Sequence, residues 1–158
     1  MRPIYNLEGM GVGATKMIIE AEDYRQVPPG YFWCEWFTGL QHSVTYEWDV
    51  RWDQWVATSS WLGVNSPDNL SRFQKWMRSE WESPLPYWFN ELEDCDTINV
   101  EFIGDKIIEV HLRPSPDPDW TTEIIPVWAD QEAPEDMVVS YDDAGGFLPV
   151  PRLGFIVR

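Results

Sequence analysis

Basic residues, cysteines and long apolar runs are all scarce in this chain of 158 residues. Its 11 lysines and arginines are outnumbered by 27 acids, and the net charge of -16 opposes direct binding to nucleic-acid phosphates or to membrane surfaces. Only two cysteines, Cys34 and Cys95, are present, so neither a disulfide framework nor a zinc site is expected. No run of about 18 apolar residues and no signal-peptide core occurs, which predicts a cytoplasmic protein.

Aromatic residues are abundant instead. The chain is 44% hydrophobic and contains 11 tryptophans, so it can bury enough apolar surface to offset the entropy lost on folding. A chain of this length suits one hydrophobic core. We therefore expect residues 1–158 to form a single domain.

Strand signals dominate the first 40 residues. An apolar segment begins at Arg2, and a second one includes Lys16 to Ile19. Between them, Gly9, Gly11 and Gly13 alternate with other residues; such a loop exposes backbone amides to phosphate oxygens, but it also suits the tip of any mobile hairpin. The aromatic run from Tyr31 to Phe37 predicts another strand.

Residues 42–61 fit two patterns. Polar and apolar residues alternate from His42 to Trp48, and residues 54–61 can return as an antiparallel strand. Alternatively, Trp48, Trp52 and Trp55 have the spacing of one helix face. The β-branched residues that flank the tryptophans favour the hairpin.

One principal helix is predicted after this hairpin. Ser66 can cap its start, Pro67 fits the first turn, and Asp68 suits the positive end of the helix dipole. Its apolar stripe contains Leu70, Phe73, Trp76 and Met77. The prolines after residue 83 should end it, and a short helical turn is expected over residues 87–92.

The segment from Ile98 to Arg113 predicts two strands joined by a tight Gly-Asp turn. Each strand places a carboxylate, Glu101 or Glu109, among apolar residues. Because burying unpaired acids is costly, this pair indicates a bound cation, and His111 and Arg113 follow closely enough to help hold phosphate oxygens. In the alternative interpretation the acids lie on the solvated face of an ordinary hairpin and His111 is structural.

The last part of the chain is predicted to add short strands. A proline-rich loop covers residues 114–119, and apolar stretches follow at 124–128, 137–141 and 153–157, with a turn at Gly145-Gly146. The expected fold class is thus α+β: a mainly antiparallel sheet with one principal helix.

The order of these elements resembles the carboxy-terminal half of an ATP-grasp domain. In that family a glycine-rich hairpin covers the ATP phosphates, a hinge strand Glu-aromatic-aliphatic-x-Gly lies beside the adenine, and two late strands supply acidic magnesium ligands before a final Glu-x-Asn-x-Arg. The corresponding stretches are Gly9 to Gly13, Glu35 to Gly39, Glu101, and Glu109 to Arg113. The resemblance covers residues 2–113 and leaves 114–158 as an extension packed on this part.

This resemblance implies Mg²⁺ and ATP as cofactors and an activity related to ATP-dependent carboxylate-amine ligases. By position, the metal ligands would be Glu101 and Glu109, with Arg113 steadying an acyl phosphate and His111 assisting. Nucleotide binding would then involve Arg2, Gly9, Gly11, Gly13 and Glu35.

The chain also departs from the family pattern. His111 occupies the position of the family's asparagine, and Arg2 that of a lysine. The sequence begins almost at the glycine loop, so a protein partner or a second copy is expected to complete the ATP cleft. A second hypothesis is a non-enzymatic acidic interaction protein, viral ones included, which binds a basic partner or mimics nucleic acid.

Overall fold

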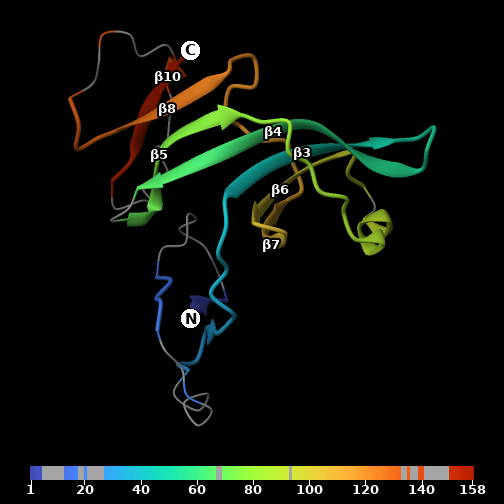
Figure 1. The fold of residues 1–158 in the computed structure, drawn as a ribbon, viewed down its shortest axis with the longest axis horizontal. Helices are drawn as coiled ribbons and strands as arrows, with labels where there is room; N and C mark the ends of the chain where they lie inside the picture. Colours follow the sequence, from blue (N-terminus) through green and yellow to red (C-terminus); the bar gives the residue numbers. More distant parts are fainter. Residues whose placement is uncertain are drawn as a thin grey trace.

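The computed structural model describes residues 1–4, 13–17, 20, 27–66, 69–92, 94–132, 135, 139–140 and 150–158. These residues form an eight-stranded antiparallel sheet and a separate two-stranded pair (Figure 1). The pair joins β1 (Arg2–Pro3) to β2 (Tyr31–Phe32), apart from the large sheet. Among the described segments, no helix is long and apolar enough to cross a membrane.

The large sheet has the strand order β7-β6-β3-β4-β5-β8-β10-β9. Its first members are β3 (Gln41–Asp49), β4 (Gln54–Ser66), β5 (Asn69–Arg78) and β6 (Thr97–Ile103). The others are β7 (Lys106–His111), β8 (Glu123–Trp128), β9 (Val139–Ser140) and β10 (Arg152–Val157). A short 3-10 helix, η2 (Tyr87–Glu91), precedes β6 and confirms the predicted turn at 87–92.

Both predicted hairpins are confirmed. In β3 and β4, Trp48 lies opposite Trp55 in an edge-to-face contact, so the tryptophan spacing belongs to a hairpin and not to a helix. In β6 and β7, the turn contains Gly104 with a φ of 61°, and the register places Glu101 directly opposite Glu109. Alternation at 42–48 thus predicted the first hairpin correctly, and the Gly-Asp turn between two apolar stretches predicted the second.

The predicted principal helix is wrong, and with it the α+β fold class, because the sheet is the main architecture. Residues 69–78 form β5, which pairs with β4 on one side and β8 on the other. Val64 pairs with Lys75 while Asn65 pairs with Phe73, so one extra residue, Gln74, bulges from β5. This bulge places Phe73 and Trp76 on one face despite their helix-like spacing, and their rings lie 4.3 Å apart.

Near the amino terminus the predicted strands are much shorter than expected. The strand at Arg2 covers two residues, and only Tyr31–Phe32 of the aromatic run is strand. Residues 14–17 contain no strand, whereas Gly9, Gly11 and residues 18–19 lie outside the described residues. The predicted late strands at 124–128, 137–141 and 153–157 correspond to β8, β9 and β10; the turn at Gly145-Gly146 is also outside the described part.

Two apolar clusters hold the sheet together. The first packs β3 and β6 against η2 and consists of Val44, Tyr46, Phe89, Ile98, Val100 and Phe102. The second joins β4, β5, β8 and β10 and consists of Trp61, Phe73, Trp76, Ile124 and Phe155. Burying side chains of this size supplies the main favourable term of folding.

Candidate functional site

The candidate site lies on the polar face of β3, β6 and β7. Residues of a strand alternate between faces, so Ile98 and Val100 enter the first apolar cluster while Asn99 and Glu101 point to the opposite side. On β7, a bulge at Ile108 separates Ile107, which packs against that cluster, from Glu109. Strand pairing thus collects polar side chains on one face of the sheet.

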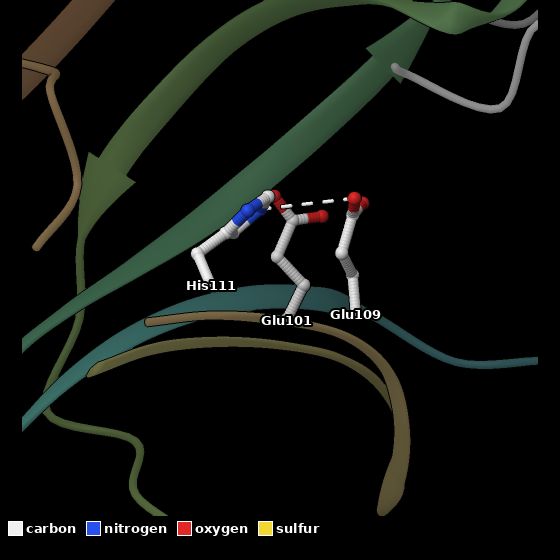
Figure 2. A group of neighbouring side chains, drawn as sticks. All are labelled: Glu101, Glu109 and His111. Atoms are coloured by element: carbon white, nitrogen blue, oxygen red, sulfur yellow. Dashed lines mark ion pairs between the residues drawn. The ribbon is translucent and has the colours of Figure 1, made fainter. Parts of the chain in front are cut away.

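Three potential metal ligands meet on this face. Glu101, Glu109 and His111 each offer one ligand atom, and these atoms all lie within 4.8 Å of one another. The Nε2 atom of His111 is 4.0 Å from Oε1 of Glu101 and 3.9 Å from Oε1 of Glu109 (Figure 2). Cross-strand pairing of Glu101 with Glu109, and the two-residue step to His111, produce this arrangement.

The two carboxylates do not lie on a solvated face. The Glu101 side chain is 22% exposed, and burial, together with the neighbouring Glu109 carboxylate, raises the pKa of Glu101 to about 7. Gln41 Nε2 donates a hydrogen bond of 3.1 Å to Oε2 of Glu101 and partly opposes this rise. Burial also lowers the pKa of His111, which favours the neutral imidazole needed for metal binding.

A cavity of about 390 Å³ opens over these residues. Its walls combine the amino-terminal segment, the polar sheet face and the start of β10. The predicted site residues that line it are Arg2, Glu35, Glu101, Glu109, His111 and Arg113. Trp36 and Phe37 add an aromatic wall beside Glu35. Segments far apart in the sequence therefore share one cavity.

The remaining predicted residues are placed differently. Gly13 has a φ of 80° and lies near Tyr31, outside the cavity lining. Gly9 and Gly11 lie outside the described residues, so the glycine loop stays a prediction. Within the cavity, Arg2 reaches the carbonyl oxygen of Ile108 at 3.5 Å, and Arg113 donates to the carbonyl oxygen of Pro114 at 3.0 Å.

Sequence reasoning missed several further charged or polar residues of the cavity, among them Asn99, Asp117 and Arg152. Asn99 could have been found, because it precedes Glu101 by two residues and shares its strand face. Asp117 and Arg152 could not, since their contact of 3.6 Å depends on how β10 pairs within the sheet. Burial raises the pKa of Asp117, and the charges of Arg152 and Arg113 oppose this rise.

No family model, curated protein or solved structure matches this chain. The resemblance to ATP-grasp enzymes therefore stays a prediction from the order of the sequence motifs.

Proposed function

We propose that the cavity binds the phosphate groups of a nucleotide through a divalent cation held by Glu101, Glu109 and His111. The observation that supports this most is the gathering of three ligand atoms within 4.8 Å inside a cavity that arginines also line. Carboxylate oxygens and a neutral imidazole are both ordinary ligands of divalent cations. Such a cation, when bound, supplies positive charge that phosphate oxygens require.

The residues present fit a cation. Two neighbouring carboxylates, of which Glu101 is largely buried, repel each other, and a cation between them would remove that repulsion. The distances of 3.9 and 4.0 Å from His111 Nε2 to the two carboxylates also leave room for a cation between the three side chains. A point equidistant from three ligand atoms about 4 Å apart lies about 2.3 Å from each of them, within the range of about 2.0–2.6 Å for bonds from divalent cations to protein ligands.

The other cavity residues suit a nucleotide. Arg2 and Arg113 bring positive charge to the rim of the carboxylate site, where phosphate oxygens would lie. Trp36 and Phe37 offer flat apolar surfaces to a base, and Glu35 is placed beside them. In this proposal the nucleotide is ATP, with Mg²⁺ as the default cation. The ligase-type reaction, with a partner chain or second copy completing the cleft, rests on the ATP-grasp resemblance.

Calorimetric titration of an unhydrolysable ATP analogue, with and without Mg²⁺, tests this proposal. We expect saturable binding that requires the cation and is lost in Glu109→Gln. The matched control is Glu47→Gln, which makes the same change at an exposed position of β3 and should bind normally. Absence of nucleotide binding to the wild-type chain would overturn the proposal, as would normal binding by Glu109→Gln.

We propose as a second candidate function the binding of a basic protein segment at the opposite end of the sheet. At the β3–β4 turn, Val50 and Trp52 are 82% and 73% exposed, and Tyr87 and Trp88 of η2 are also exposed. Residues 47–53 and 80–96 contain nine acids and one base, Arg51. Exposed aromatic rings among acids are suited to arginine side chains.

An oligoarginine peptide is a suitable probe for this second function. Trp52→Ala should weaken its binding, whereas Trp120→Ala, which removes another exposed tryptophan outside this surface, should leave it unchanged. Equal loss of affinity in both variants would indicate general charge attraction and would contradict a defined docking surface.

A further inference from the structure

The third ligand of the proposed cation site is a nitrogen, and this decides which cations it should prefer. Building on the proposed function, we infer that Glu101, Glu109 and His111 select a first-row transition-metal dication, such as Mn²⁺, Co²⁺ or Zn²⁺, over Mg²⁺. Mg²⁺ strongly prefers oxygen ligands and gives up its waters reluctantly. Imidazole nitrogen instead favours transition-metal dications, with affinity generally rising from Mn²⁺ through Co²⁺.

His111 is oriented as a ligand. Its Nε2 atom points toward both carboxylates, and its distances to them, 3.9 and 4.0 Å, exceed hydrogen-bond length (Figure 2). The three ligand atoms therefore leave a space between them, with the imidazole beyond hydrogen-bond distance of both carboxylates. A cation in this space would contact the imidazole nitrogen and both carboxylates together, so the nitrogen belongs to the same ligand set as the oxygens.

The hydrogen bond that Glu101 accepts from Gln41 supports this ligand set. Gln41 donates its hydrogen bond to Oε2 of Glu101, whereas the distance to His111 is measured to Oε1. The hydrogen bond fixes the carboxylate while leaving the oxygen nearer the imidazole for the cation. Fixed outer-shell contacts of this kind typically matter for metal affinity. The ring of His111 is itself largely buried, with 27% of the side chain exposed.

The test uses the metals alone, without nucleotide. Mg²⁺ and Mn²⁺ are titrated into the wild-type chain and into His111→Asn, which substitutes an amide for the imidazole. The wild type should bind Mn²⁺ at least about tenfold more tightly than Mg²⁺, and the variant should lose most of this preference. The visible absorption spectrum of bound Co²⁺ should also differ between the two proteins, because it reports nitrogen coordination.

Comparable affinity for Mg²⁺ and Mn²⁺ in the wild type would overturn the inference, as would an unchanged preference in His111→Asn. Thermal unfolding of the metal-free variant shows whether it is folded, and His111→Gln provides a second substitution if it is not. The proposed function can fail separately from this inference. If the wild type prefers Mn²⁺ but binds no nucleotide, the metal selectivity stands and the proposed nucleotide binding is overturned. Conversely, if the chain binds the nucleotide but has equal affinity for Mg²⁺ and Mn²⁺, only the metal selectivity is contradicted.

Discussion

At the scale of single residues, the Glu101 carboxyl links the site to stability. Burial, reinforced by Glu109, raises its pKa from 4.5 to about 7 in the folded chain. The folded state then holds this proton more tightly than the unfolded state does. The resulting stabilisation is fully present below the unfolded-state pKa and is lost as pH rises through the folded-state pKa of about 7.

Glu101→Gln should therefore become more stable relative to the wild type as pH rises. Between pH 5 and pH 8, without divalent cations, we expect the difference in free energy of unfolding to shift in favour of the variant by about 2–3 kcal/mol. Urea denaturation at both pH values measures this shift. Glu47→Gln, the same change at an exposed position of β3, is the matched control, and a pH-independent difference for Glu101→Gln would contradict the buried, protonated carboxyl.

Gly63 is a second residue at which a single added atom should change the stability of the fold. It lies opposite Trp76 on the neighbouring strand, and a Cβ atom there would meet the rings of Phe73 and Trp76 at 2.8 Å. These rings belong to the second apolar cluster, are each 8% exposed, and also line the cavity. The absence of a side chain at Gly63 therefore allows both rings to pack directly on β4.

We expect Gly63→Ala to destabilise the fold by about 1–3 kcal/mol, because the added methyl overpacks this cluster. The midpoint of urea denaturation should fall accordingly. Gln54→Ala, at an exposed position of the same strand, serves as the control and should change stability little. Equal stability of the Gly63 variant and the wild type would show that the rings can move aside.

At the scale of elements, the β6–β7 hairpin was predictable because its information is local. Alternation, a Gly-Asp turn and the cross-strand acids lie within 16 consecutive residues, so the sequence alone identified the strands and the Glu101, Glu109 and His111 group. The β5 strand was not predictable in this way. The cap residue Ser66 and the i, i+3 spacing of Phe73 and Trp76 favour a helix locally. Pairing on both sides of β5 and the bulge at Gln74, one of two register shifts against β4, instead bury both rings in a strand.

The bulge at Gln74 makes this explanation testable. Deleting Gln74 should turn Phe73 or Trp76 to the opposite face of the sheet, because a one-residue shift reverses side-chain direction. Removing one such ring from the second apolar cluster should cost about 3–5 kcal/mol of stability or prevent folding.

Denaturation of the deletion variant and of Gln74→Ala provides the comparison. The substitution keeps the residue count and alters an exposed side chain, so it should change the free energy of unfolding by only about 0.5 kcal/mol. If the deletion changes the free energy of unfolding as little as the substitution does, the bulge does not determine on which face of the sheet the two rings lie.

At the scale of the whole molecule, the cavity depends on contacts that no local pattern contains. Arg2 enters it from the amino terminus and Arg152 from β10, near the other end of the chain, while the carboxylates come from the middle. Sequence spacing does not bring these charges together: Arg2 belongs to the separate β1–β2 pair and Arg152 to β10, whereas the carboxylates belong to β6 and β7. Meanwhile the net charge of -16 opposes any polyanionic ligand at long range.

Under the proposed function, arginines that line the cavity supply the local attraction, and Arg2 is the clearest test of this. Arg2→Gln should weaken nucleotide binding by roughly tenfold, because it removes a charged donor beside the proposed phosphate position. Arg51→Gln lowers the total charge by the same amount at the exposed β3–β4 turn, and calorimetry should detect little change. Equal losses in the two variants would mean that overall charge, and not the position of Arg2 in the cavity, governs binding.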